Sequence, residues 1–397
     1  MRPLSSCIQN DISGKNPQYL TFILHGWRTG GLEALVSREK KRYTNIVYDK
    51  ITMQFDPTEV FRMSERYPQQ DAFTQRGVAQ PVNVTGLRRA ALLNDLSCFG
   101  KCSITVGLPI LSAAGVVALP LPTALLSTHT GGFSGYSCTE LTGEMQRIAD
   151  HWQTLELQLD GIATGYFCSP EQIEFSRRFI RRFAGPDTLV LVDPVMADGG
   201  VLYDGFDAAF AEKMRILCSG AEVITPNLTE ALLLAGLPYE EKPEAALLEE
   251  CLTRLRQLGA RRVIITGVHR TPALAQLPCE HIAAGRVCED PAAKEIGCLC
   301  IDAQGKQFAV WHPFAQTALH GCGDVFSAAF LAAALGERQN TAPLADEKAF
   351  RRAVHTAACF TSRCVQATVS EKYPGHWYGL RFEACLAEGF WGTTEKR

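Results

Sequence analysis

The residues best suited to chemistry lie in the segment HGCGDVF, residues 320–326. Two glycines allow a tight backbone turn, and the apolar, alanine-rich run after Asp324 predicts a helix. The amides of Gly321, Cys322 and Gly323 would then lie at a helix N-terminus, where they can bind phosphate oxygens. A carboxylate placed there can accept the proton of an attacking hydroxyl group, which makes Asp324 the candidate general base. The alternative is an ordinary helix cap, because Asp is also a preferred N-cap residue.

Two further segments supply carboxylate and amide oxygens. In VDPVMADGGVLY, Asp193 ends a predicted strand and Asp198 lies in the loop that follows. Mg²⁺ prefers oxygen ligands and keeps most of its waters, so one or two carboxylates beside bound phosphates are sufficient. In ITPNLTEALLL, Asn227 and Glu230 could serve the hydrated metal and the phosphates. The same residues are typical of helix capping, and both roles can hold together.

Strands and helices are predicted to alternate from about residue 86 onward. Buried strands are expected at 159–167, 188–195, 221–227 and 261–267, and amphipathic helices at 170–183, 207–218, 228–235 and 243–258. This alternation predicts a mainly parallel sheet with helices on both faces, whose ligands bind at the carboxyl ends of the strands. Polar residues end each of these strands, among them Tyr166, Asp193, Thr225, Thr266 and Gly267.

Residues 102–128 contain no charged side chain, and this stretch exceeds the roughly 20 apolar residues that cross a bilayer. Pro109, Pro120 and Pro122 argue against a membrane span, because proline interrupts helices. We expect a buried helix at about 103–114 and a short buried strand at about 116–119, with the prolines separating the pieces. Residues 88–93, RRAALL, form only a weak strand pattern.

Composition narrows the possible functions. The chain has 397 residues, 46% of them apolar and 20% charged, with a net charge of −3, which predicts a soluble globular protein large enough to enclose a ligand. This charge balance gives no footprint for nucleic acid or a membrane surface. The 15 cysteines lack the paired spacing of a structural zinc site, and no signal peptide pattern precedes them, so we expect a reducing cytoplasm.

Several short segments together resemble the pyridoxal/pyridoxamine kinases of the ribokinase superfamily. They occur in the order of that family between about residues 90 and 386, and they are NDLSCFGKCS, LPTALLSTHTG, TGYF, DPVMADGG, TPNLTEA, HGCGDVFSAAF and HWYGLRFE. The resemblance implies a ribokinase-like three-layer α/β/α domain with a mainly parallel central sheet. It also implies transfer of phosphate from Mg-ATP to the 5′-hydroxymethyl group of a B6 vitamer, by a protein that forms homodimers.

The resemblance also implies roles for individual residues. Asp324 would be the catalytic base, and the anion hole would consist of Gly321, Cys322 and Gly323. The vitamer pocket would be lined by Asp95, His129, Thr130 and Tyr166. The metal and phosphates would be served by Asp193, Asp198, Asn227 and Glu230, and the nucleotide would lie near Thr225, Thr266 and Gly267.

Two residues depart from the pattern of the family. Cys322 stands where a hydroxyl residue is usual, and a thiol is a poorer hydrogen-bond donor. Ala197 stands where glycine is common, and alanine would be strained there if the position required a positive φ angle.

Two alternatives to a pyridoxal kinase remain at this stage. A hydroxymethylpyrimidine kinase would share the phosphate chemistry and a small heteroaromatic alcohol, and a binding protein of the same fold would lack turnover. We expect residues 1–85, which contain the charge run REKKR, to be a poorly ordered extension, and residues 86–397 to be the kinase domain. The segment 267–301, rich in Pro, Ala and Cys, is expected to be a loop near the nucleotide.

Overall fold

The structure is a computed structural model that describes residues 83, 86–281, 294–315, 319–336, 344, 346–369 and 376–390. All of these residues belong to one compact unit, Gln80–Arg397. The expected extension, residues 1–85, lies outside the described residues except for position 83, and so does its charge run.

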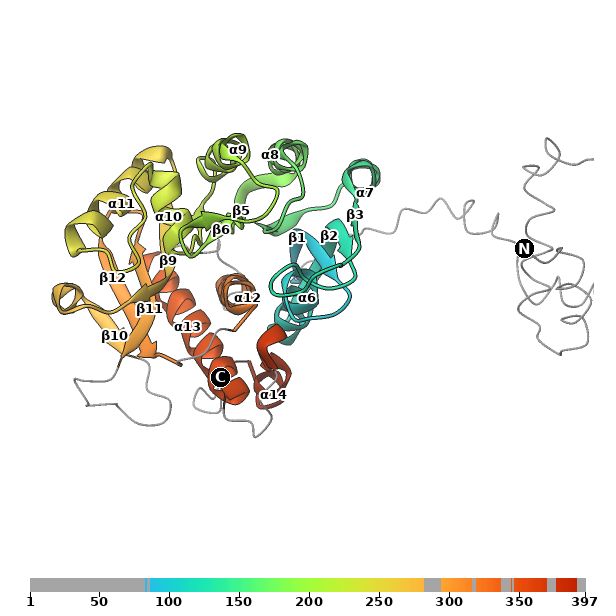
Figure 1. The fold of residues 1–397 in the computed structure, drawn as a ribbon. Helices are drawn as coiled ribbons and strands as arrows, with labels where there is room; N and C mark the ends of the chain where they lie inside the picture. The colour runs from blue at the N-terminus through green and yellow to red at the C-terminus, as the bar shows by residue number, and fades with distance from the viewer. Residues whose placement is uncertain are drawn as a thin grey trace, which may run out of the picture. The chain divides into compact units, whose positions relative to one another are not determined.

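A ten-stranded sheet forms the centre of the described unit, in the order β10-β12-β11-β9-β8-β5-β4-β1-β2-β3 (Figure 1). The consecutive strands from β2 to β9 in this order run parallel, whereas β3 and β11 run antiparallel to their neighbours. The strands are β1 (Arg88–Ser97), β2 (Val116–Leu126), β3 (Cys138–Glu140), β4 (Leu159–Thr164), β5 (Ala184–Val192), β8 (Val223–Ile224), β9 (Arg262–His269), β10 (Cys279–His281), β11 (Glu295–Ile301) and β12 (Gln307–Pro313).

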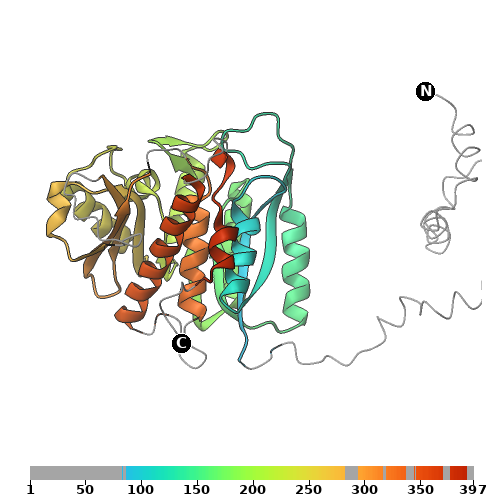
Figure 2. The same ribbon diagram turned by 90° about the horizontal axis from the view of Figure 1, so that it is seen from below.

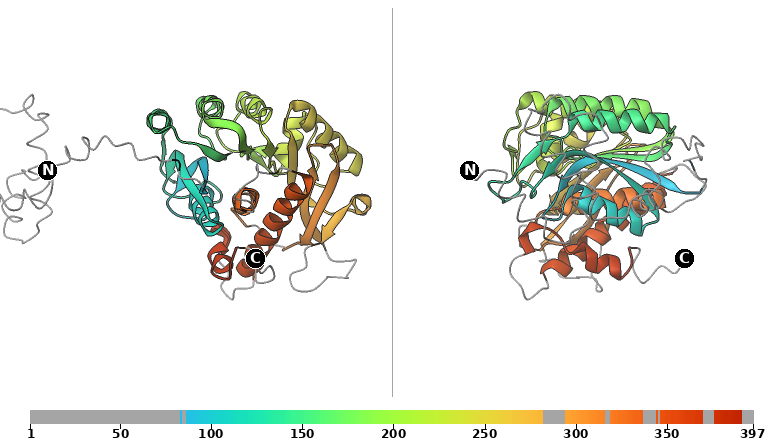
Figure 3. Two further views of the ribbon diagram at one scale, coloured as in Figure 1. Left: turned by 180° about the vertical axis from the view of Figure 1, so that it is seen from behind. Right: turned by 90° about the vertical axis from the view of Figure 1, so that its right-hand side faces the viewer.

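Helices cover both faces of this sheet (Figures 2 and 3). One face carries α7 (Thr142–Thr154), α8 (Pro170–Phe183), α9 (Ala208–Cys218), α10 (Leu228–Ala235) and α11 (Ala245–Leu258). The other carries α6 (Ser103–Ala113), α12 (Cys322–Gly336), α13 (Glu347–Val369) and α14 (Phe382–Ala387). Each set of helices packs its own hydrophobic core against the sheet. The predicted three-layer α/β/α architecture is confirmed.

Helix α12 is buried along most of its length, which explains its alanine-rich sequence. It packs against α6, α13 and the sheet, and small side chains permit this close approach on several sides. Gly161 in β4 contributes to the fit, because a Cβ atom there would lie 2.8 Å from Leu335 Cδ1. The N-terminus of α12 is thereby fixed beside the carboxyl ends of the central strands.

Most predicted elements are present, several with the expected bounds. Helices α8 and α10 match the predicted ranges 170–183 and 228–235, and α9 begins one residue later than predicted, after its N-cap Asp207. Residues 88–93, whose strand pattern is weak in the sequence, belong to β1, a ten-residue strand in the middle of the parallel region.

The expected break of strand 116–119 at the prolines was wrong. Strand β2 continues through Pro120 and Pro122 to Leu126. It pairs with β1 along this length, whereas β3 pairs only with Ala124–Leu126 on the other side. Proline is tolerated where its nitrogen faces an unpaired sheet edge, and no strand in the described residues pairs with this edge at Pro120 or Pro122. Every helix in the described ranges is too short or too polar to span a bilayer.

The expected loop at 267–301 is largely regular structure. Strand β9 extends to His269, the short 3₁₀ helix Pro272–Gln276 follows, and β10 and β11 are both sheet strands. Residues 282–293 lie outside the described ranges. The sequence signal was obscured because consecutive residues of β11 and β12 are buried, so these strands lack the alternation of polar and apolar residues.

Candidate active site

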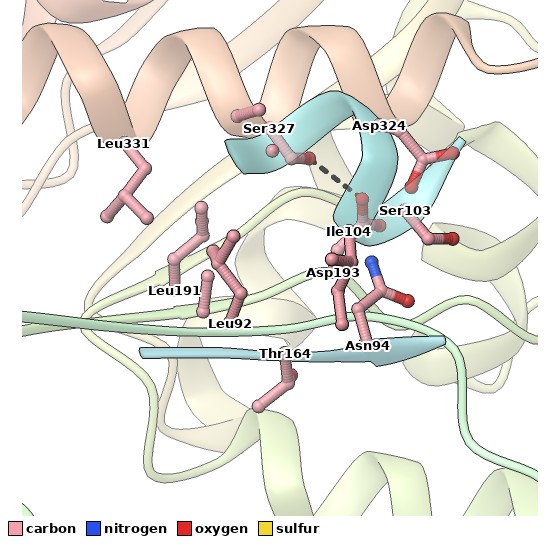
Figure 4. A pocket seen from close by; sticks show the side chains of 13 residues that line it. Leu92, Asn94, Ser103, Ile104, Thr164, Leu191, Asp193, Asp324, Ser327 and Leu331 are labelled. Carbon is pink, nitrogen blue, oxygen red and sulfur yellow. Dashed lines mark hydrogen bonds between the residues drawn. The ribbon is translucent and has the colours of Figure 1, made fainter. Parts of the chain in front are cut away.

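A small pocket lies where the carboxyl ends of β1, β4 and β5 meet the N-termini of α6 and α12 (Figure 4). Its polar lining consists of Asn94, Ser103, Thr164, Asp193, Asp324 and Ser327. Leucine side chains line the other end of the pocket. Thr164 Oγ1 is buried and has no hydrogen-bond partner in the described part of the protein, so it is available to a group inside the pocket.

Asp324 lies in the first turn of α12 and faces this pocket. Burial, and then the nearby carboxylates of Asp193 and Asp95, raise the pKa of its carboxyl group from 3.8 to about 8. Hydrogen bonds from the backbone of Ser103 and the side chain of Asn94 act in the opposite direction. A carboxyl group that titrates near neutral pH is suited to accept a proton from an alcohol.

Asn94 is held in one orientation by two backbone amides. Its Oδ1 accepts hydrogen bonds from Tyr166 N at 2.8 Å and from Asp95 N at 3.0 Å. Because both contacts use the oxygen, the Nδ2 group is the one that donates to Asp324. Gly165 provides the necessary space, since a Cβ atom there would lie 2.4 Å from Asn94 Nδ2. Asn94 therefore orients the carboxylate of the candidate base.

Ser103 connects two buried carboxyl groups at the start of α6. Its backbone N–H donates to Asp324, and its hydroxyl donates to Asp95. The residue has a φ angle of 53°, a left-handed conformation that costs a non-glycine residue about 1–2 kcal/mol. The N-cap residue, Cys102, provides no side-chain cap, so the Asp324 carboxylate satisfies an amide that the helix leaves without a partner. Strain of this kind is common at functional sites.

Asp193 follows β5 directly and belongs to a buried hydroxyl network. Ser327 Oγ donates to Asp193 Oδ2 at 2.8 Å, and Thr225 Oγ1 lies 3.0 Å from Ser327 Oγ. Burial raises the pKa of Asp193 to about 7, although the hydrogen bond from Ser327 acts in the opposite direction. The network connects the end of β5 to α12, so Asp193, the metal and phosphate candidate, is held on the same frame as the candidate base Asp324. Thr225 is turned into this network rather than toward open space.

Asn227 and Glu230 form the capping box that their spacing predicts. Asn227 Oδ1 accepts from Glu230 N at 2.9 Å, and Glu230 Oε2 accepts from Asn227 N at 2.9 Å. Glu230 Oε1 also accepts from Met196 N at 3.0 Å, and Asn227 Nδ2 donates to Ala197 O at 2.7 Å. Burial, and then Asp193, raise the pKa of Glu230. Both residues therefore fix the loop after β5 to the start of α10.

Asp198 lies in a tight hairpin between β6 (Ala197–Asp198) and β7 (Val201–Leu202). Gly199 and Gly200 have φ angles of 57° and 85°, which is the geometry of a two-residue hairpin turn that glycine favours. Ala197 itself lies in β6 and has no positive φ angle, so the strain considered for alanine at this position is absent.

The carboxylates on this side of the pocket suit a hydrated Mg²⁺ better than a metal enclosed by protein. No group of three or more His, Cys, Asp or Glu side chains in the described ranges is arranged to enclose a metal ion. Asp198 is exposed, and only its Oδ1 bonds to the adjacent Gly199 amide, at 2.8 Å. Mg²⁺ that is held mainly by phosphates and waters needs no more than one or two such carboxylates. Glu230 would reach it only through water, because backbone amides occupy both of its oxygens.

The anion hole predicted from the sequence is a turn that leads into α12. Gly321 has a φ angle of 82°, and a Cβ atom there would lie 2.3 Å from Lys101 O, so only glycine fits. Helix α12 begins at Cys322, and Val325 N donates to Gly321 O at 3.0 Å. Burial raises the pKa of the Cys322 thiol to about 12, and its Sγ contacts Leu319 O. The amides of Cys322 and Gly323 lie in the first turn of α12, where a helix leaves N–H groups without an internal partner, and the thiol of Cys322 is neutral and faces its own turn.

The residues predicted for the vitamer pocket fall into two groups. Asp95 is buried close to Asp324 and accepts from Ser97 Oγ at 2.7 Å. Tyr166 joins this group through its backbone, but its ring lies 5.9 Å from that of Phe206. His129 lies in an aromatic cluster outside the pocket lining, and Thr130 beside it is exposed. Near the predicted nucleotide end, Thr266 pairs with Asn227 and Gly267 has an open left-handed conformation.

The aromatic cluster was largely missed by sequence reasoning, which singled out only His129. The other members are Phe99, Phe133, His320, Trp377 and Tyr378. The ring of His129 lies 5.3 Å from the ring of His320, the residue directly before Gly321. Burial, and then His129, lower the pKa of His320. The available signal was the segment HWYG near the end of the chain, which supplies two of these rings.

The fold and the site define this protein as a ribokinase-like α/β/α protein with a buried carboxylate at a helix N-terminus. Residues 104–379 match the family described as phosphomethylpyrimidine kinase, and the chain belongs to this family.

Solved structures and curated relatives agree with this assignment. A Bacteroides thetaiotaomicron structure described as a phosphomethylpyrimidine kinase is 33% identical, with a TM-score of 0.64, and the match covers 77% of this chain and 95% of that one. A second crystal form, with pyridoxal, is 34% identical, has a TM-score of 0.63 and covers 76% and 95%. Pyridoxal kinase from Lactobacillus plantarum is 28% identical, with a TM-score of 0.62, covering 76% of this chain and 96% of that one.

Curated relatives include kinases named for pyridoxal and kinases named for hydroxymethylpyrimidine. Pyridoxal kinase PdxY of Pasteurella multocida is 32% identical over 160 residues, which is 38% of this chain and 53% of that protein. The chain therefore spans about half the length of this curated relative. Hydroxymethylpyrimidine/phosphomethylpyrimidine kinase of Bacillus subtilis is 26% identical over 272 residues, or 68% of this chain and 86% of that protein.

Proposed function

We propose that this protein transfers the terminal phosphoryl group of ATP to the 5′-hydroxymethyl group of pyridoxal, pyridoxamine or pyridoxine. The observation that carries the proposal is the position of Asp324. Its buried carboxyl group, with a pKa raised to about 8, lies at the N-terminus of α12 and beside the amides of residues 321–323. A base and an anion-binding turn in contact are the two elements that phosphoryl transfer to an alcohol requires.

In the proposed reaction, the substrate hydroxyl group approaches the Asp324 carboxylate from the pocket. Asp324 accepts the hydroxyl proton while the substrate oxygen forms a bond to the terminal phosphorus, and the bond from that phosphorus to ADP breaks. The amides of Gly321, Cys322 and Gly323 would stabilise the charge that develops on the transferred group. Asn94 and Ser103 hold the carboxylate in place through the transfer.

We also propose that Asp193 and Asp198 serve a bound Mg²⁺. The ion would neutralise charge on the ATP phosphates. The hydroxyl network around Asp193 fixes that carboxylate, and the hairpin at Gly199 and Gly200 presents Asp198 to solvent. Burial raises the pKa of Asp193 to about 7, so a neighbouring cation would favour its charged form.

The choice of a B6 vitamer is supported by the 34% identical structure that was solved with pyridoxal. Hydroxymethylpyrimidine kinase is the second candidate, and the relative from Bacillus subtilis favours it because its match covers 68% of this chain. We further propose a homodimer in a reducing cytoplasm. The described cysteines are all free thiols, which agrees with that location.

The test is direct. Purified protein is incubated with Mg-ATP and, separately, pyridoxal, pyridoxamine, pyridoxine or hydroxymethylpyrimidine, and the phosphorylated product is separated by chromatography. We expect turnover of at least one B6 vitamer. Turnover of hydroxymethylpyrimidine alone would establish the second candidate. Binding of a vitamer without any product would instead identify a binding protein of the same fold.

A further inference from the structure

A four-residue segment near the end of the chain contacts three separate loops of the candidate active site. We call residues 376–379, the 3₁₀ turn His376–Tyr378 with Gly379, the C-terminal clamp. Tyr378 O accepts hydrogen bonds from Lys101 N at 3.1 Å and from His129 Nε2 at 3.0 Å. Trp377 O accepts from His320 N at 3.3 Å. Two consecutive carbonyl groups thus join the loop after β1, the loop after β2 and the turn that leads into α12.

The hydrogen bond from His129 to Tyr378 O also determines which ring nitrogen of His129 carries the proton. A carbonyl oxygen can only accept, so Nε2 carries the proton in this hydrogen bond. In the neutral ring, Nδ1 is then an acceptor. The clamp therefore determines both the position and the hydrogen-bonding character of a residue predicted to face the substrate.

Side chains of the clamp pack closely enough to exclude even a methyl group. The Trp377 ring lies 4.7 Å from that of Phe133. A Cβ atom at Gly132 would lie 2.7 Å from the Trp377 ring, and one at Gly379 would lie 2.3 Å from Lys101 Cβ. This packing leaves no space for the loops to move relative to the clamp without a loss of contact.

The clamp is attached firmly to the body of the protein. Leu380 and Phe382, which follow it, are buried in the hydrophobic core that also includes α12 and α13. Arg381 N donates to Thr368 Oγ1 of α13 at 2.9 Å, and Lys101 Nζ contacts Glu383 Oε2 at 2.7 Å. Displacement of the clamp would therefore be resisted by α13 and α14, and not only by the loops.

We propose that the C-terminal clamp is a positioning element that sets the anion-binding turn at residues 320–323 against the loop that carries His129. This role rests on the proposed function. The turn and the loop are about 190 residues apart in sequence, and the clamp bonds to both. Gly321 adds a direct link, because its close approach to Lys101 O ties the turn to the loop that the clamp holds. A displacement of about 1 Å between catalytic groups can reduce the rate by about 100-fold.

Two glycines in one loop provide a matched test. Gly132 and Gly135 have φ angles of 80° and 70°, so alanine causes similar backbone strain at either position. Only at Gly132 does the added methyl group meet the Trp377 ring, because nothing lies within 4 Å of a Cβ atom at Gly135. We expect Gly132→Ala to lower kcat/KM for the vitamer by about 10-fold or more, and Gly135→Ala to change it by less than about twofold. The KM for ATP and the melting temperature should be similar in the two variants.

A second variant, Trp377→Phe, tests the clamp independently in case Gly132→Ala does not fold. Trp377→Phe removes part of the indole ring without adding atoms, and it should also raise KM or lower kcat for the vitamer while the protein still melts cooperatively. In the double variant with Gly132→Ala, the smaller ring leaves room for the methyl group, so activity should exceed that of Gly132→Ala alone. Equal activity of the two glycine variants, or normal activity of Trp377→Phe, would overturn the proposal.

Hydrogen exchange separates failure of the clamp from failure of the proposed function. Peptides covering residues 97–102, 128–133 and 319–323 should lose protection together in Gly132→Ala and keep it in Gly135→Ala. This readout needs no turnover, so it remains informative if the wild-type protein phosphorylates none of the tested alcohols. Unchanged protection in Gly132→Ala would show that the three loops are not held by the clamp.

Discussion

Replacement of Asp324 by asparagine should make the protein more stable while it abolishes catalysis. Burial raises the pKa of this carboxyl group from 3.8 to about 8. Between these values the folded state binds a proton that the unfolded chain has lost, so the stability of the wild-type protein falls as pH rises. Asparagine removes the titrating group and therefore this loss.

The size of the effect depends on pH in a way that can be calculated. Each pH unit above 3.8 lowers the free energy of unfolding of the wild-type protein by about 1.4 kcal/mol, which gives a loss of about 1.6 kcal/mol at pH 5 and about 4 kcal/mol at pH 7. In the variant, the asparagine NH₂ group would face one of the two groups that donate to Asp324, the Ser103 N–H or the Asn94 amide. Two donors that face each other cannot form a hydrogen bond, which costs about 1–2 kcal/mol. We therefore expect little difference in the free energy of unfolding at pH 5, and a gain of about 2–3 kcal/mol at pH 7.

Urea unfolding of both proteins at pH 5, 6, 7 and 8, followed by far-ultraviolet circular dichroism, provides the measurement. Acidic groups far from Asp324 titrate alike in both proteins, so their contributions largely cancel in the difference, whereas Asp193 and Asp95 lose a neighbouring charge in the variant. Phosphoryl transfer by the variant should fall by several orders of magnitude, whereas vitamer binding should persist, because the base acts in the transition state. A stability difference that stays constant across this pH range would refute the burial argument, and near-normal turnover would refute the assignment of the base.

Three further predictions follow from the same geometry. The value of kcat/KM should rise with pH toward about 8, because only the charged Asp324 carboxylate accepts a proton. Asn94→Ala removes a hydrogen bond that lowers the pKa of Asp324, so the rising limb of the pH profile should move to higher pH. Ser103→Gly should be about 1 kcal/mol more stable than Ser103→Ala in thermal or urea unfolding, because both lose the hydroxyl group but only glycine relieves the left-handed strain; equal stabilities would argue against strain. A chain that begins at Gln80 should keep a cooperative melt and full phosphoryl transfer, since residues 80–397 form one compact unit; aggregation of that shorter chain would contradict the prediction.

The sequence was sufficient for the parts of the site that local rules determine. Asp324 follows a glycine-rich turn and precedes an apolar helix, and Asp193 ends a buried strand, so their placement follows from element order alone. The capping box at Asn227 and Glu230 was predictable for the same reason, because its contacts span only three residues.

The parts that could not be predicted depend on contacts between distant segments. The role of Asn94 requires the amide of Tyr166, which follows the neighbouring strand β4 and lies 72 residues away. The left-handed conformation of Ser103 leaves no sequence signal, because serine rarely adopts it and tertiary contacts impose it here. The HWYG segment was recognisable only through resemblance, since its partners lie far away in the chain.

The prolines of β2 have a consequence for how copies of this protein could associate. Pro120 and Pro122 are two residues apart, so their nitrogens face the same side of the strand, away from β1. The edge of the sheet at Pro120 and Pro122 therefore lacks a regular row of N–H donors with which a strand of another molecule could pair. Pairing of two such sheets edge to edge is disfavoured here, and a homodimer that uses this side must rely on side chains such as the exposed Val117.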